Sequence, residues 1–136
     1  MADVEPVIYT KLSGTAGITA LVSTRIYPVQ GPQGGTRPLI VYTKVSDTPL
    51  NYMTPGTNSD SNIRVRFHAI AETYAGAKAV AAAIRAAIDA WRDLTTTPKI
   101  QSALPIGEYD ATEYQTEGKE TAMHVVSLDY SIWISA

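Results

Sequence analysis

Two histidines, together with scattered serines and carboxylates, are the residues of this chain whose side chains could carry catalysis or bind a metal. His68 and His124 lie in different predicted strands, and the chain has no cysteine. A zinc site would need carboxylates or further imidazoles as its remaining ligands, and none stands at a ligand-like spacing. A Ser/His/Asp set could be assembled from a serine, His124 and Asp129, but no nucleophile-elbow sequence is present. We therefore predict no catalytic residue, no metal and no cofactor, and interpret the histidines as polar residues on a sheet face.

The glycine-rich stretch GPQGGTRP, residues 31–38, is a second candidate site, for phosphate. A phosphate-binding loop presents its backbone amides at the start of a helix, often beside a lysine. Here the glycines lead into a predicted strand, Pro32 and Pro38 remove two amides, and no Gly-Lys-Ser/Thr follows. The stretch is better interpreted as a surface connection.

Basic residues on neighbouring strands are the best case for contact with an anion or a nucleic acid. We expect one basic sheet face that holds Lys44, Arg64, Arg66 and His68. No aromatic residues interleave with these cations, as a stacking platform for bases would require, and the net charge of the chain is -2. A solvated or subunit-facing surface is therefore favoured over nucleic-acid recognition.

Acidic residues crowd the C-terminal part, where we predict a long hairpin. Like charges at this density keep a hairpin solvated and protect it from edge-to-edge aggregation. The residues are Glu108, Asp110, Glu113, Glu117 and Glu120.

Length and composition predict one domain over residues 1–136. The chain is 45% hydrophobic and 18% charged, so it can bury a real core. No apolar run approaches the roughly 20 residues that a spanning helix needs, and the N-terminus lacks a basic start followed by an apolar block. We expect a soluble protein without a membrane partner.

Three helices are predicted from periodicity. Two short helices cover EPVIYTKLSGTAGITALVS, residues 5–23, interrupted at Ser13-Gly14, with Thr15 as the cap of the second. A longer amphipathic helix covers residues 73–94 and is capped by Thr73. The apolar stripes are Val7, Ile8 and Leu12, then Ile18, Leu21 and Val22, and in the long helix Ala77, Val80, Ala81, Ile84, Ile88 and Trp91.

Extended segments make up most of the remainder. RIYPV, residues 25–29, has a strand-like composition, and Pro28 indicates an edge strand or the end of a strand. In PLIVYTKVSDTPL, residues 38–50, we place Leu39, Val41, Thr43 and Val45 on one face and Ile40, Tyr42, Lys44 and Ser46 on the other. NIRVRFHAIAE, residues 62–72, turns Ile63, Val65, Phe67 and Ala69 inward. Residues 99–115 and 121–135 form the hairpin, with Val126, Leu128, Tyr130, Ile132 and Ile134 on one face. The fold class is α+β.

A long connection between two of these strands is the first candidate for a partner contact. It runs from Asp47 to Ser61 and contains two apolar anchors, Tyr52 and Met53. Loops longer than about 12 residues tend to be functional or disordered. The residues expected to bind partners are Asp47, Leu50, Asn51, Tyr52, Met53, Arg64, Arg66, Glu113 and Glu117.

Several stretches together resemble the tail-completion (tail-terminator, tail-to-head joining) proteins of long-tailed bacteriophages. The resemblance spans most of the chain and rests on the order and spacing of packing residues. These are Leu21, Arg25-Ile26-Tyr27-Pro28, Pro38, Val41-Tyr42, Tyr74, Ala77, Ala81, Ile84, Arg85 and Ile88.

The resemblance implies a structural virion protein and no enzyme. Its helices would pack on one face of a mainly antiparallel sheet, and six copies would form a ring. That ring would cap the tail tube protein, end polymerisation and join the tail to the head connector or stopper, while DNA passes through the lumen without specific binding. The loop would order on the tube or on an adjacent subunit, and the acidic hairpin would face the lumen or a neighbour. A head-side connector or stopper ring, or a small hydrolase, are the alternatives.

Overall fold

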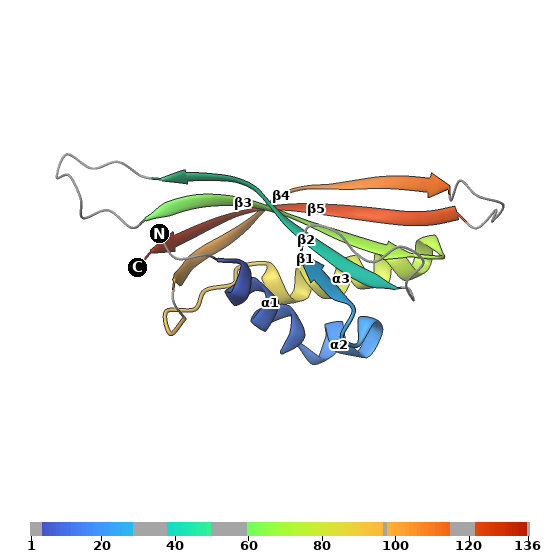
Figure 1. Cartoon of the computed structure of the whole chain (residues 1–136), viewed down its shortest axis with the longest axis horizontal. Helices are drawn as coiled ribbons and strands as arrows, with labels where there is room; N and C mark the ends of the chain where they lie inside the picture. Colours follow the sequence, from blue (N-terminus) through green and yellow to red (C-terminus); the bar gives the residue numbers. More distant parts are fainter. Residues whose placement is uncertain (1–3, 29–37, 50–59, 97, 115–121, 136) are drawn as a thin grey trace.

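The computed structural model describes residues 4–28, 38–49, 60–96, 98–114 and 122–135, and of residues 111–114, 122 and 123 it describes the backbone. A five-stranded sheet carries three helices on one of its sides (Figure 1). The elements are α1 (Glu5–Ser13), α2 (Ala16–Val22), β1 (Ile26–Pro28), β2 (Leu39–Pro49), β3 (Ser61–Ala71), α3 (Tyr74–Ile88), β4 (Lys99–Tyr114) and β5 (Ala122–Ser135).

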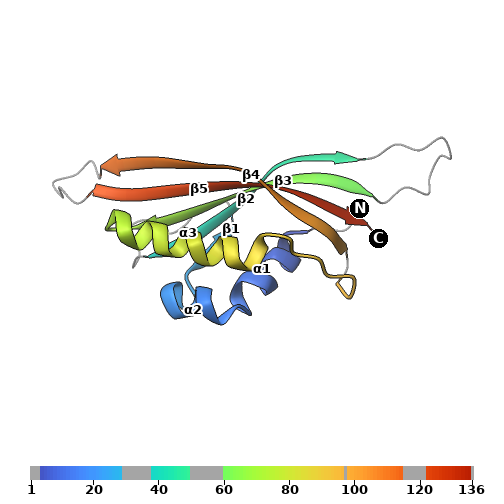
Figure 2. The ribbon, with the colours of Figure 1, turned by 180° about the vertical axis from the view of Figure 1, so that it is seen from behind.

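The strand order is β1-β2-β3-β5-β4, so β3 lies at the centre and β4 forms one edge. β1 runs parallel to β2, and the other neighbours are antiparallel. We call the side that packs on the helices the inner face and the opposite side the outer face. Figure 2, from behind, again shows α1, α2 and α3 on a single side of the sheet. The predicted α+β fold with helices on one face is confirmed.

The inner face of β3 and β5 forms the core with α3. Alternate residues of β3, from Ile63 through Phe67 to Ala69, are buried, as predicted. Phe67 meets Tyr130 of β5 edge to face, with ring centroids 5.8 Å apart. The predicted inward set of β5 is also buried: Val126, Leu128, Tyr130, Ile132 and Ile134.

The helix α3 buries its whole predicted stripe, including Trp91, which follows the helix. Thr73 caps it, since its Oγ1 accepts a hydrogen bond from the Gly76 amide at 3.0 Å. The helix ends at Ile88 and not at 94, because Asp89 leaves the helical conformation and Ala90 has a φ of 58°.

The N-terminal helices differ from expectation in two details. Leu21 is 37% exposed, so it does not belong to the buried stripe of α2. Thr15 occupies the cap position of α2, but its hydroxyl donates to the carbonyl of Lys11 at 2.7 Å and accepts nothing from the helix.

Strand β2 departs most from the prediction. Leu39 to Tyr42 are all buried, and a bulge between Lys44 and Ser46 shifts the register. Because of this extra residue, Ser46 pairs with Arg64 on the outer face, while Lys44 stays on the inner face. The predicted pairing of Lys44 and Ser46 on one face is therefore wrong.

The connection between β2 and β3 is shorter than the predicted span from Asp47 to Ser61. Asp47, Thr48 and Pro49 continue β2 and pair with Ile63, Asn62 and Ser61. Only residues 50–60 connect the two strands.

Beyond the pair of Ala71 with His124, β5 has β4 as its sole neighbour among the described strands. The last described pair is Tyr114 with Ala122. We call residues 113–123, the end of this hairpin, the arm.

Candidate functional site

The outer face of the sheet is built around one carboxylate and two guanidinium groups. Asp129 of β5 is fully buried, although α1, α2 and α3 lie on the opposite side of the sheet. Arg66 of β3 donates from Nε to Oδ1 at 2.7 Å and from Nη2 to Oδ2 at 3.0 Å. Arg64, two residues earlier on the same face, donates from Nη2 to Oδ2 at 2.7 Å. Strand alternation brings the arginines together, and the β3–β5 register places Asp129 opposite Arg66.

These contacts keep Asp129 ionised. Its pKa is lowered, mainly by the hydrogen bond from Arg66 and further by that from Arg64, against the effect of burial. The same bond raises the pKa of Arg66. Two cations share one anion, so one positive charge on this face is not balanced by Asp129. The Arg64 and Arg66 side chains are 39% and 38% exposed.

The predicted basic face is therefore corrected in two respects. Lys44 lies on the inner face, where its Nζ is 3.4 Å from Glu5 of α1 and 4.0 Å from Asp47. The two arginines share Asp129, so this face carries one unbalanced positive charge and not two free cations.

Polar pairs extend the outer face along β3 and β5. His68 Nδ1 lies 2.9 Å from Ser127 Oγ, and Asn62 donates to Ser131 Oγ at 2.7 Å. The carboxylate of Asp129 bonds arginines, and His124 packs on the ring of Tyr74 at the start of α3. The structure therefore does not bring His124 and Asp129 together as a catalytic set.

Large apolar side chains border the arginines on the outer face. Leu104 and Tyr109 of β4 are 53% and 49% exposed, and Trp133 of β5 is 37% exposed. The register pairs them with Ser131, Ser127 and Ser102, which places all three on the outer face. Several large exposed apolar groups on one face are typical of an interaction surface.

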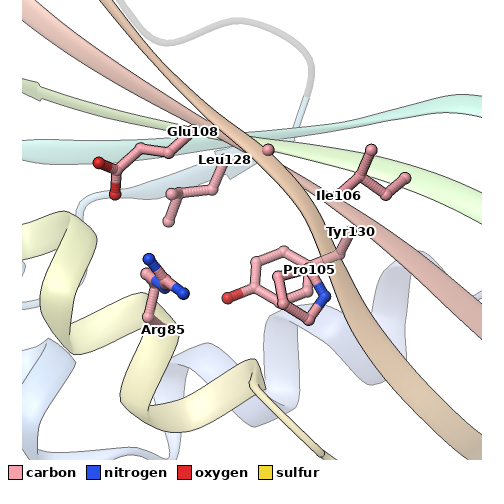
Figure 3. Close-up of a pocket in the computed structure, with 7 residues that line it drawn as sticks. Arg85, Pro105, Ile106, Glu108, Leu128 and Tyr130 are labelled. Carbon is pink, nitrogen blue, oxygen red and sulfur yellow. The ribbon is translucent and has the colours of Figure 1, made fainter.

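A pocket of about 180 Å³ lies on the inner side, between α3 and β4 (Figure 3). Arg85 of α3 and Glu108 of β4 border it, with Pro105, Leu128 and Tyr130 forming apolar walls. The Tyr130 hydroxyl donates to Asp89, and burial, then this bond, raise the pKa of Tyr130. The pocket has no nucleophile paired with a base among its lining residues.

The acidic hairpin is partly neutralised by α3. Lys78 Nζ lies 2.9 Å from Glu108 Oε2 and 3.3 Å from Asp110 Oδ1, and these contacts, Glu108 first, raise the pKa of Lys78. The Tyr74 hydroxyl donates to Asp110 at 2.8 Å, which lowers the pKa of Asp110. Glu108 and Asp110 are thus held against α3, which the expectation of a solvated hairpin did not include.

The remaining predicted partner-binding residues are only partly described. Asp47 lies in β2 beside Lys44, and Glu113 pairs through its backbone with Met123. Four lie outside the described residues: Leu50, Asn51, Tyr52 and Met53. Glu117 and Glu120 also lie outside them.

Sequence reasoning missed Asp129 as the centre of the outer face. The available signal was a lone acid among Ser127, Ser131 and Trp133 at alternate positions, opposite a strand with two arginines. Among the described residues, no group of three or more His, Asp or Glu could hold a metal ion. In the same part of the chain, no helix is long and apolar enough to cross a membrane.

Comparisons with known proteins identify the family of this chain and a solved structure of similar fold. The family described as "Tail completion protein gp17" matches residues 6–135. Among solved structures, a chain from the virion of a native gene transfer agent (GTA) particle is similar in fold, with a TM-score of 0.66 and 18% identity. The alignment covers 95% of this chain and 92% of that chain. No curated protein matches the sequence.

Proposed function

The chain belongs to the tail completion protein gp17 family, and we propose that it forms a ring that caps the phage tail tube, ends tail polymerisation and joins the tail to the head connector. Family membership makes the chain a structural protein of the bacteriophage virion, located in the tail. The ring, the cap and the joining role are the part that we propose.

The observation that carries the proposal is the outer face of the sheet, which none of the described helices covers. It exposes Leu104, Tyr109 and Trp133 beside the cluster of Asp129, and a lone subunit leaves them to water. A surface of this kind is typical of a protein that works inside an assembly. The similar fold of a chain in the GTA virion supports the proposal that this chain works inside an assembly.

A closed head-to-tail ring needs two different complementary surfaces on each subunit. The outer face is charged and aromatic. The helix side instead exposes small residues of α3 together with two larger apolar side chains of the N-terminal helices. These are Ala75, Ala79, Ala82 and Ala86, and Tyr9 and Leu21. The unlike chemistry of the two sides suits such a ring.

We assign six copies to the ring and a single domain to residues 1–136. Its partners would be the tail tube protein on one side and the head connector or stopper on the other. DNA would pass through the lumen without specific binding. The connection of residues 50–60, with Tyr52 and Met53 as anchors, would order on the tube or on an adjacent subunit.

The test is the mass of the purified protein, alone and after mixing with tubes assembled from its cognate tube protein, with tube ends imaged by electron microscopy. A ring at one end of each tube, and tubes that no longer elongate, are the expected result. Tubes of an unrelated phage serve as the control. A protein that ignores cognate tubes but binds the head connector would instead be a head-side connector or stopper ring.

A further inference from the structure

We propose that the arm of each subunit, residues 113–123, lies across the outer sheet face of the next subunit, where its carboxylates meet Arg64 and Arg66. This inference rests on the ring of the proposed function and names the surfaces that close it. The occupant of the outer face is thus a second copy of this chain.

The receiving surface carries an excess of positive charge. Asp129 is buried and accepts hydrogen bonds from both arginines, whereas each arginine side chain remains more than one third exposed. Arg64 Nε is buried without a hydrogen-bond partner among the described residues. A second carboxylate reaching this face would balance the remaining charge and accept the outward-facing guanidinium protons.

The receiving surface is also apolar at its border, where Leu104, Tyr109 and Trp133 are exposed. Burying aromatic and aliphatic side chains around a charged centre excludes water from it and strengthens the ionic contact. A purely electrostatic contact would not need this border.

The arm has the complementary charge. It contains Glu113, Glu117 and Glu120 against Lys119, a net charge of -2 within eleven residues. The nearer acids of the hairpin are already used, since Glu108 and Asp110 contact Lys78. The arm adds three further acids to the hairpin by its sequence.

Where the arm begins, the described strands are only β4 and β5. Past His124, the hairpin continues as two strands without β3 beside them. A two-stranded ribbon on its own is marginally stable in water, and it gains stability by packing against another surface.

An arm cannot reach the outer face of its own sheet at Leu104. Tyr114 and Leu104 lie ten residues apart on the same strand, which corresponds to roughly 30 Å at about 3.3 Å per residue. Contact between the arm and Leu104 must therefore come from a different subunit.

Cross-linking tests this contact at introduced cysteines, since the chain has none of its own. T116C and L104C variants are co-assembled on tails in equal amounts, and the particles are treated with a short bis-maleimide. We expect covalent dimers of one T116C chain and one L104C chain. The matched control pairs T116C with R92C, at an exposed position after α3 that belongs to neither ring surface named above, and should give no dimer above background.

The arm charges provide the second readout. E113Q/E117Q/E120Q should reduce the T116C–L104C dimer, and the corresponding lysine triple variant should abolish it. Raising the salt concentration should weaken the contact in the parent pair, because added ions screen exposed charges.

The outcomes separate this inference from the proposed function, because the same preparation is scored for capped tails. Capped tails that give no T116C–L104C dimers, or that give T116C–R92C dimers in equal yield, would overturn the docking and leave the capping role intact. Attachment of a photoreactive group on L104C to the packaged DNA would assign the outer face to the channel and also overturn the docking. Failure of the cysteine-free protein to cap tails would count against the proposed function itself.

Discussion

Arg66 binds Asp129 through two hydrogen bonds, from Nε to Oδ1 at 2.7 Å and from Nη2 to Oδ2 at 3.0 Å, although the two residues are 63 positions apart in the chain. The pair joins the central strand β3 to β5 on the face that the helices leave uncovered. It therefore links the stability of the sheet to the surface that we assign to assembly.

Removing Arg66 or Asp129 should destabilise the protein, and the loss of Asp129 should cost more. Arg66→Ala should lower the free energy of unfolding by about 1–2 kcal/mol, since the arginine is partly exposed and solvent screens its charge. Asp129→Ala leaves two guanidinium groups without their buried anion and should cost about 3 kcal/mol or more. Urea denaturation measures both, with the exposed Arg92→Ala as a control within about 0.5 kcal/mol of the parent. Additive effects of R66A and D129A in the double variant would contradict the pairing.

The pH dependence of stability should report on the same carboxylate. The pKa of Asp129 is lowered from its ordinary value of 3.8, so its contribution is present above that value and is lost as the pH falls through the folded-state pKa. Between pH 5 and about 2, Asp129→Asn should lose less stability than the parent. Asp93, whose pKa is lowered by Thr95, titrates in the same window, so D93N is the comparison variant. Equal acid sensitivity in D129N and the parent would refute the assignment.

The hydroxyl of Tyr130 should contribute to stability through its bond to Asp89. Tyr130→Phe keeps the edge-to-face contact with Phe67 but removes the hydrogen bond, and should cost about 1–2 kcal/mol. Thermal and urea unfolding give the value, and Tyr9→Phe at an exposed position is the matched control. Since the pKa of Tyr130 is raised, the folded state should also lose stability as the pH rises above about 10, and Y130F should lose less. A Y130F variant as stable as the parent would show that the bond contributes nothing.

Two threonines at helix starts should respond differently to truncation. Thr73 accepts a hydrogen bond from the Gly76 amide, so Thr73→Ala should cost about 1 kcal/mol, and Thr73→Ser should recover most of it. Thr15 occupies the equivalent position of α2 without capping it, so Thr15→Ala should cost less. Melting temperatures of the three variants decide the order. An effect of T15A as large as that of T73A would argue against the difference in capping.

The connection between β2 and β3 should matter for assembly more than for folding. Replacing residues 51–59 with Asn-Gly retains the described pair of Pro49 with Ser61, so the unfolding midpoint should change little. Tail capping should be lost, since Tyr52 and Met53 are removed with the loop. Capping is scored by electron microscopy of tube ends, and the Y52A/M53A variant isolates the anchors. Full capping by the shortened protein would remove the loop from the mechanism.

The sequence alone determined the local architecture of this protein and, through the order of its packing residues, the family to which it belongs. The apolar stripe of α3 and the alternation of buried residues in β3 and β5 are confirmed. Burial of one face requires apolar residues at every third or fourth position of a helix and at every second position of a strand, and this spacing can be read from consecutive residues. The tail-completion resemblance is confirmed over residues 6–135.

The tertiary structure alone decided which charges meet. Arg64 and Arg66 contact Asp129 because β5 lies between β3 and β4 in the sheet. Lys78 of α3 contacts Glu108 because α3 lies close to the edge strand β4. The bulge in β2 turned Ser46 to the outer face against the simple alternation. Pairing of distant segments depends on the strand order and register that bury the most apolar surface across the whole chain. A short stretch of sequence does not determine this strand order and register. The charges of the outer face meet only because of them.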